Sequence, residues 1–207
     1  AEEALGGKVV LTARSAEGKI PLRPDDPRWD EADRLEVPLS GQLIVRPRWP
    51  NPSVDRATVR ALHDGRSIAF RISWFDRFKN ESHKVPKRFL APQRDSFVSV
   101  KDQLALRTAR DAIALQFPAK PPAGPRKPYF FLGGARSAVD LWEWRADWQK
   151  NPADHGGRTV LEQVGKGFSR PPANKPAREH HVRSQASFSA GQWQGGIVRP
   201  LQTPNPK

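Results

Sequence analysis

The sequence predicts an all-β fold, an antiparallel β-sandwich with a few short helices and long Pro-rich loops. Short segments alternate apolar and polar residues with the two-residue period of strands, and turn residues separate these segments. The 21 prolines and 15 glycines indicate many turns and irregular connections. No long helical period lies between the strand segments, which argues against βαβ units. A chain of 207 residues suits one core, so we expect a single domain over residues 1–207.

The clearest strand lies at residues 67–76. Its apolar side chains alternate with smaller or polar ones, so we expect one face of the strand to be buried. The alternating apolar residues are Ile68, Phe70, Ile72 and Trp74. A β-prone run at 57–66 precedes it and ends near Asp64 and Gly65, a dipeptide that favours a tight hairpin turn. The two runs are therefore expected to pair as antiparallel strands.

Five other segments have the composition of strands. They lie at residues 8–14, 41–47, 111–117, 138–144 and 191–199. In the fourth segment Trp142 and Trp144 are two residues apart and share one face. The tracts 119–128 and 169–176 are rich in proline, which cannot donate a hydrogen bond within a central strand. We expect both tracts to form surface loops.

The chain is strongly basic, with a formal charge of +13 and a pI of about 10.7. Such a protein attracts anions, whether nucleic acid, acidic lipid or an acidic partner protein. The charge is uneven, because residues 25–36 contain six acids, whereas residues 166–207 contain seven Lys or Arg and the single acid Glu179. A basic surface in the C-terminal part can therefore dock a partner.

The composition excludes several kinds of site. The chain has no cysteine, which excludes disulfides, thiolate metal sites and the covalent attachment of a c-type haem. No apolar run approaches the roughly 18 residues that a membrane-spanning helix needs. The chain begins AEEALGG without Met, as expected for a mature chain after removal of a signal peptide, and equally for a trimmed one.

Common catalytic motifs are missing from the sequence. It contains no GxSxG elbow, no Walker A loop, no HExxH and no GxGxxG after a strand. Of the five histidines, only His180 and His181 are close in sequence. Adjacent residues on an extended chain point to opposite faces, so joint metal binding would need a local bend, and solvated loop histidines are the simpler interpretation.

Six segments, in this order along the chain, carry a resemblance to a known family. They are DPRWDEADRLEVPLSGQ (26–42), GRSIAFRISWFD (65–76), DAIALQFP (111–118), KPYFFLGG (127–134), VDLWEWRADWQ (139–149) and GQWQGGIVRPL (191–201). Together they resemble the haem-binding γ subunits of ethylbenzene dehydrogenase and related dimethyl sulfoxide reductase-type molybdoenzymes. The resemblance covers most of the chain, and it rests on the six segments together because no single motif is decisive.

The resemblance implies a β-sandwich that holds one non-covalent haem b. Such a subunit relays electrons between a periplasmic molybdoenzyme and an external redox partner, and it is not itself an enzyme. The implied partners are a molybdopterin catalytic subunit, an iron–sulfur subunit and a soluble redox partner, with no nucleic acid and no membrane span. The implied location is the periplasm.

The resemblance also implies the axial ligands of the haem iron, a Met and a Lys. The Met would fall in PYFFLGG, where Leu132 stands directly before Gly133, and a leucine cannot ligate iron. The chain contains no Met at all, so we favour a methionine omitted from the sequence between Leu132 and Gly133. A normal spacing of about 3.8 Å between their Cα atoms would exclude it.

The second ligand would be a Lys that follows the RPL segment, and the chain stops soon after, at Lys207. Either this C-terminal segment of the family is absent, or another residue serves. Within the chain Lys166 and His181 are the candidates, and each is equally explained as a solvated loop residue.

The implied haem pocket draws on neighbouring strand segments. Gly133 and Gly134 would let the backbone approach the porphyrin closely. Arg136 and Arg145 are candidate partners of the haem propionates, although solvated surface charges explain them equally well. The apolar shell, which ordinary core packing also explains, would comprise Phe117, Phe130, Phe131, Leu132, Trp142 and Trp144.

Two other classes of function remain open from the sequence. A carbohydrate-binding β-sandwich would use exposed tryptophans as sugar platforms and would lack a buried haem-sized cavity. A basic nucleic-acid-binding protein would stack bases on tryptophans and lose affinity steeply with salt. The seven tryptophans permit both, although core packing is the ordinary role of tryptophan in alternating apolar strands.

Overall fold

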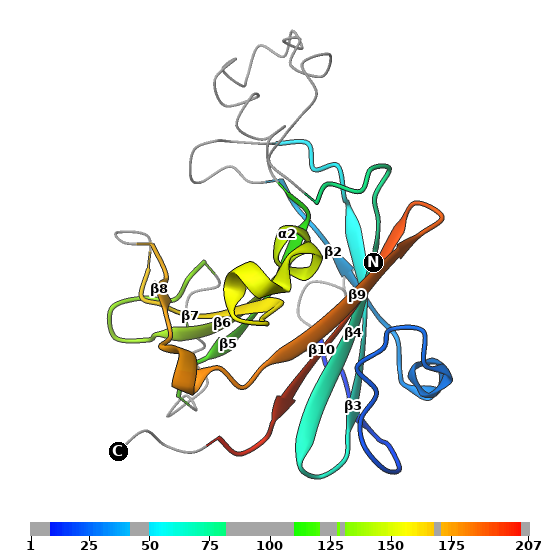
Figure 1. Cartoon of the computed structure of the whole chain (residues 1–207), viewed down its shortest axis with the longest axis horizontal. Helices are drawn as coiled ribbons and strands as arrows, with labels where there is room; N and C mark the ends of the chain where they lie inside the picture. The colour runs from blue at the N-terminus through cyan, green and yellow to red at the C-terminus, as the bar shows by residue number, and fades with distance from the viewer. Residues whose placement is uncertain are drawn as a thin grey trace, which may run out of the picture.

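The computed structural model describes residues 9–41, 50–81, 110–120, 128, 131–167 and 171–203. Within these residues the chain forms two β-sheets, joined by loops and a few short helices (Figure 1). In Figure 1 the larger sheet lies on the right and the smaller, green and yellow sheet on the left. The predicted all-β sandwich is therefore confirmed.

The larger sheet has six strands in the order β1-β3-β4-β10-β9, with β2 paired to β3. All its neighbours are antiparallel except β1, which pairs with β3 in parallel. The strands are β1 (Arg14–Ser15), β2 (Leu35–Pro38), β3 (Arg56–His63), β4 (Ser67–Phe75), β9 (Arg183–Ser189) and β10 (Gln192–Pro200).

The predicted hairpin is the β3–β4 pair, and its turn follows from local chemistry. Gly65 has a φ of 77°, a left-handed conformation that glycine adopts without steric cost. The Asp64 carboxylate accepts hydrogen bonds from the backbone N–H groups of Arg66 and Ser67, at 2.9 and 2.7 Å. These two hydrogen bonds stabilise the turn.

The smaller sheet has four antiparallel strands in the order β5-β6-β7-β8. They are β5 (Ala112–Pro118), β6 (Val139–Arg145), β7 (Val160–Gly165) and β8 (Ala173–Asn174). The helical elements are short: α2 (Ala146–Lys150) and the 3-10 turns η2 (Pro27–Glu31), η4 (Pro152–His155) and η5 (Ala177–Glu179). Among the described residues, no helix is long and apolar enough to span a membrane.

The main core lies between the two sheets and is aromatic. Trp74 and Trp193 come from the larger sheet, and Trp142 and Trp144 from the smaller one. The rings of Trp144 and Trp193 are 5.0 Å apart, and those of Trp74 and Trp144 are 5.9 Å apart. The shared face predicted for Trp142 and Trp144 is thus the face that joins the sheets.

A second, smaller core covers the other face of the larger sheet. The loop that contains η2 places Trp29, which is fully buried, against Leu62, Ala69 and Val198. The indole N–H of Trp29 donates to the carbonyl oxygen of Arg23 at 2.9 Å. This hydrogen bond satisfies the polar atom of an otherwise apolar contact.

Some strand predictions need correction. Of residues 8–14, those that the structure describes form a strand only at Arg14, and the segment 41–47 lies almost wholly outside the described residues. The Pro-rich tract 169–176 contains the two-residue edge strand β8. Strands β2, β7 and β9 were not predicted, because β2 has only four residues and charged or polar residues interrupt the apolar pattern of the other two.

Replacing Trp144 with alanine should lower the free energy of unfolding by about 3–5 kcal/mol, because this side chain is 1% exposed and its loss leaves a cavity. The control is Phe75→Ala at the 60% exposed end of β4, which should change stability by only about 0.5 kcal/mol. Urea titrations followed by circular dichroism measure both values. Equal losses would contradict the central position of Trp144.

Candidate functional site

The connection between β5 and β6 ends in a turn at residues 131–138, which we call the β5–β6 turn. It contains the second half of the segment KPYFFLGG (127–134). Backbone hydrogen bonds of 3.1 Å join Gly134 and Ser137 in both directions. The N–H of Leu132 donates to Oε1 of Gln116 at 3.1 Å. Leu132 and Gly133 have φ values of 60° and 69°, in the left-handed region that disfavours leucine. The surrounding contacts therefore hold Leu132 in a backbone conformation that leucine disfavours.

The end of β7 closes on this turn. The N–H of Gly167 donates to the carbonyl oxygen of Leu132 at 2.7 Å. A Cβ atom at Gly165 would lie 3.0 Å from the same oxygen, and one at Gly167 would lie 3.6 Å from the Cα of Gly134. Lys166 is exposed and lies between these two contacts. The structure therefore brings Lys166 next to the turn that holds Leu132.

The turn lies over one face of the smaller sheet, which we call the outer face. Gln116, which accepts from Leu132, is paired with Leu141 across β5 and β6. Gly165, which contacts the turn, is paired with Val139. Because paired residues share a face, the outer face carries Val139 and Leu141, which are 0% and 6% exposed. The turn thus covers an apolar part of the sheet.

The three aromatic residues expected in the same pocket point the other way. Trp142 and Trp144 alternate with the outer-face residues of β6 and lie in the core between the sheets. Phe117 joins them there, with its ring 4.4 Å from that of Trp142. These side chains form the sandwich core and are separated from the turn by the sheet itself.

The remaining predicted pocket residues lie in or beside the turn. Phe131 and Leu132 are half-buried, and Gly133 is buried. Phe130 lies outside the described residues. The structure therefore brings together Phe131, Leu132, Gly133 and Gly134.

The two predicted propionate partners lie at opposite ends of β6. Arg136 is exposed on the turn itself. Arg145 ends the strand six residues after Val139, which is about 20 Å away at the usual rise per residue. Its guanidinium pairs with Asp147 at 3.1 Å and lies over the ring of Trp148. Only Arg136 is placed close to the turn.

The outer face becomes charged toward the end that carries Arg145. Glu143 lies there, and burial raises the pKa of its carboxyl, an effect that the nearby guanidinium groups of Arg145 and Arg110 partly offset. Both guanidinium groups pair with Asp147, at 3.1 Å each. The outer face therefore runs from an apolar end under the turn to an ionic end.

A cluster of buried charges lies behind the turn, on the inner face of the smaller sheet. Lys175 Nζ is 2.5 Å from Asp140 Oδ1 and 3.8 Å from Glu162 Oε2, and Arg199 Nη1 is 3.1 Å from Asp140 Oδ2. The side chains of Asp140 and Glu162 are 9% and 0% exposed. Two cations thus balance two buried carboxylates. An acid inside the apolar run VLEQV is the sequence signal that could have revealed Glu162.

Glu162 also fixes the segment that contains the paired histidines. Its Oε1 accepts hydrogen bonds from the backbone N–H groups of His181 and Val182. His181 is therefore held on the inner side of β7, whereas Leu132 lies over the outer face. The described residues contain no group of three or more His, Cys, Asp or Glu that could hold a metal ion.

The turn packs directly on the sheet. Gly167 lies against Gly134, and Val139 and Leu141 are already covered, at 0% and 6% exposed. Of the two nitrogen donors predicted as ligands, Lys166 lies beside the turn and His181 does not. Leu132 has no lone pair to offer, and the methionine proposed between Leu132 and Gly133 stays a prediction.

The tryptophans of the described residues offer no exposed stacking platform. Trp148 is half-buried, and one of its faces stacks on His155 at 4.1 Å. The other described tryptophans lie in the two cores and are each at most 6% exposed: Trp29, Trp74, Trp142, Trp144 and Trp193. In this part of the chain, neither sugar stacking nor base stacking on tryptophan is therefore supported.

Comparisons with known proteins give a consistent picture. The sequence model of the family described as ethylbenzene dehydrogenase matches residues 26–171. A Haloferax mediterranei protein named as a respiratory nitrate reductase haem subunit is 21% identical over 207 residues, which cover 95% of this chain and 62% of that protein. The Ideonella dechloratans chlorate reductase subunit gamma is 24% identical over 197 residues, covering 93% of this chain and 66% of that subunit. The chain thus spans somewhat less than two thirds of these relatives.

A solved structure of a Bacteroides uniformis protein described as carbohydrate-binding aligns with this chain at a TM-score of 0.46 and 11% identity. The alignment covers 91% of this chain and 71% of that one.

Replacing Gly133 with alanine should destabilise the turn through a direct clash, because the added Cβ would lie 2.4 Å from the carbonyl oxygen of Ser137. Gly65→Ala is the matched control, since Gly65 has a similar φ of 77° but open space around its Cβ position. We expect a loss of about 1–2 kcal/mol at Gly65 from backbone strain alone, and a larger loss at Gly133. Chemical denaturation compares the two, and equal losses would contradict the close contact.

Replacing Lys175 with methionine should lower the free energy of unfolding by about 3–5 kcal/mol, because it leaves buried carboxylates without their shared cation. Lys150→Met provides the control, since the Lys150 side chain is 52% exposed and its partner lies 3.8 Å away. That change should cost at most about 1 kcal/mol. Thermal unfolding at neutral pH measures both changes in stability. A Lys175 variant as stable as the wild type would show that the charge cluster does not stabilise the fold.

Proposed function

Because the chain belongs to the ethylbenzene dehydrogenase family, as its resemblance predicted, we propose that it is a haem-binding subunit that relays electrons in a larger reductase complex. The family match over residues 26–171 is the observation that carries this proposal. The relative named as a haem subunit supports the cofactor.

The proposed cofactor is a non-covalent haem b, since a chain without cysteine cannot form the thioether bonds of a c-type haem. Haem supplies a one-electron redox couple when bound. Lys166 is the side chain that would hold the iron from the end of β7. Gly134 and Gly167, which carry no side chain, would let the backbone lie close to the porphyrin.

The protein's own residues would position the cofactor and would make or break no substrate bond. Leu132, held in a left-handed turn by Gln116 and Gly167, would contact the cofactor or lie beside the proposed methionine. Arg136, exposed on the same turn, would face the propionates, which are anionic. The chain on its own would therefore not be an enzyme.

The proposed partners are a molybdopterin catalytic subunit, an iron–sulfur subunit and a soluble redox protein in the periplasm. Names of reductase subunits among the relatives support an assembly of this kind. The formal charge of +13 would speed the encounter with an acidic partner, because opposite net charges steer association.

The absorption spectrum of the purified chain after addition of haemin tests the proposed function. We expect a Soret band in the oxidised protein and sharp α and β bands after reduction with dithionite. A spectrum with protein absorbance alone would overturn the assignment of a haem subunit.

The role proposed for Lys166 can be tested separately. Lys166→Ala should weaken haem binding by at least roughly tenfold and shift the Soret band, because an iron ligand is lost. Lys120→Ala, which removes an exposed lysine two residues after β5, should leave both unchanged. Haemin titrations followed by absorbance compare the variants. Unchanged affinity and spectrum in Lys166→Ala would assign the ligand to another residue.

A further inference from the structure

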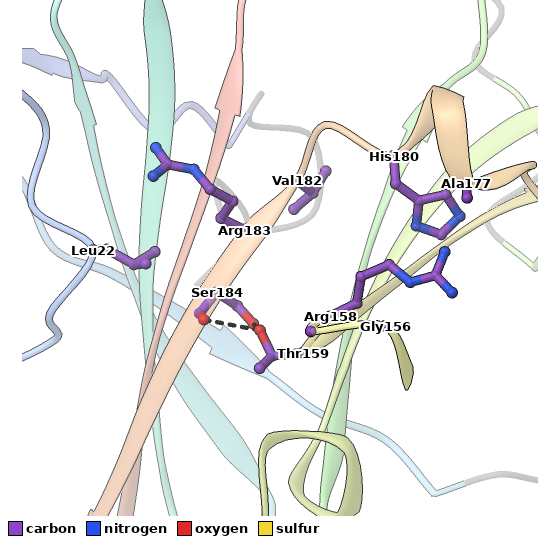
Figure 2. Close-up of a pocket in the computed structure, with 10 residues that line it drawn as sticks. Leu22, Gly156, Arg158, Thr159, Ala177, His180, Val182, Arg183 and Ser184 are labelled. Atoms are coloured by element: carbon purple, nitrogen blue, oxygen red, sulfur yellow. Dashed lines mark hydrogen bonds between the residues drawn. The ribbon is translucent and has the colours of Figure 1, made fainter. Parts of the chain in front are cut away.

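A cavity of about 550 Å³ lies where the start of β7 meets the start of β9 (Figure 2). Its lining comes from three parts of the chain: the turn 156–159 before β7, residues 177–184, and Leu22. This volume is typical of sites for small organic molecules. The turn with Leu132 contacts the opposite end of β7, at Gly165. The cavity is therefore distinct from the proposed haem site.

The lining of the cavity is cationic. It includes Arg158 and Arg183 and no Asp or Glu. Nε of Arg158 donates to the carbonyl oxygen of His155 at 2.9 Å, and in the described part of the chain neither arginine forms an ion pair. Figure 2 shows that Arg158 extends toward the side occupied by His180, whereas Arg183 points away from both. One guanidinium group thus remains available inside the cavity.

His180 contributes an acceptor with a defined orientation. Its Nε2 is 2.8 Å from the carbonyl oxygen of Lys175. A carbonyl oxygen can only accept, so Nε2 carries the hydrogen and Nδ1 of the neutral ring is an acceptor. This Nδ1 is buried and has no hydrogen-bond partner in the structure. A buried polar atom without a partner is unfavourable, and a donor group on a ligand would satisfy it.

The other polar groups of the cavity are already used. The hydroxyl of Thr159 donates to the carbonyl oxygen of Ser184 at 2.9 Å and lies 2.8 Å from the Ser184 hydroxyl. Figure 2 shows this pair linking β9 to the residues just before β7. The N–H groups of Gly156 and Gly157 bond to Ala153 and Pro152. The hydroxyl pair therefore fixes the wall, and Arg158 and His180 are left to recognise a ligand.

We propose that this cavity binds a small hydroxylated carboxylate of the sugar-acid class. The planar fork of Arg158 suits a carboxylate, and a single inward cation matches one negative charge better than a dianionic phosphate. A hydroxyl group of the ligand donates to Nδ1 of His180. Val182 and Leu22 contact the carbon chain. This site is independent of the proposed haem, so either assignment can fail without the other.

Three six-carbon probes separate these contributions in the full chain: gluconate has a carboxylate and hydroxyls, hexanoate has only the carboxylate, and sorbitol has only the hydroxyls. Titrations followed by ¹H–¹⁵N NMR should show gluconate binding most tightly, with shifts confined to Leu22 and to residues 156–159 and 177–184. Gluconate binding no tighter than sorbitol, or shifts elsewhere, would overturn the proposal.

Arg158→Gln tests the anion contact. It should weaken gluconate binding at least tenfold and leave sorbitol binding unchanged. Arg178→Gln is the matched control, because Arg178 lies in the neighbouring η5 turn, is 80% exposed and does not line the cavity. It should bind gluconate like the wild type. An Arg158 variant with wild-type affinity would overturn the proposal.

His180→Phe tests the hydroxyl contact. It should reduce gluconate affinity to that of hexanoate and leave hexanoate affinity unchanged. Thermal unfolding checks that the variant is folded. If it is not, the comparison of gluconate with hexanoate in the wild type decides the same point, and equal affinities there would remove the role of His180.

Discussion

The two faces of strand β6 organise the rest of the molecule. Its seven residues alternate between an inner face, where Trp142 and Trp144 join the two sheets, and an outer face, where Val139 and Leu141 lie under the β5–β6 turn. One strand therefore serves both the core and the candidate site. The side of the sheet on which a residue lies decides which of these two environments it enters.

The buried charge cluster connects the smaller sheet to the segment that precedes β9. Asp140 lies on the inner face one residue after Val139, which contacts the turn, and Glu162 lies on the same face opposite Trp142. Burying two carboxylates is costly, and Lys175 and Arg199 offset that cost only in one arrangement of the chain. The same lysine accepts from His180 through its carbonyl oxygen. The cluster thus orders the segment that forms the sugar-acid cavity.

Several features were predictable because they depend on local patterns. The alternation at 67–76 identified β4, and the Asp64–Gly65 turn identified its hairpin partner. Strands β7 and β9 were missed because Glu162 in one, and serines and glutamine in the other, break the apolar period. Lys175 and Glu162 meet only in the folded chain, so their pairing leaves no local pattern. The arrangement of Arg158 and His180 around one cavity arises in the same way.

The sequence by itself determined the sandwich class, the family and the shared face of Trp142 and Trp144, because strand period and motif order are properties of neighbouring residues. Only the tertiary structure decided which side of the sheet each residue faces. It divided the predicted haem pocket into core aromatics and the residues of the turn, and it placed Lys166, but not His181, beside Leu132. The physical reason is that alternation along a strand determines only which side chains share a face. The packing of the second sheet and of the turn determines whether that face is the core or the outer face.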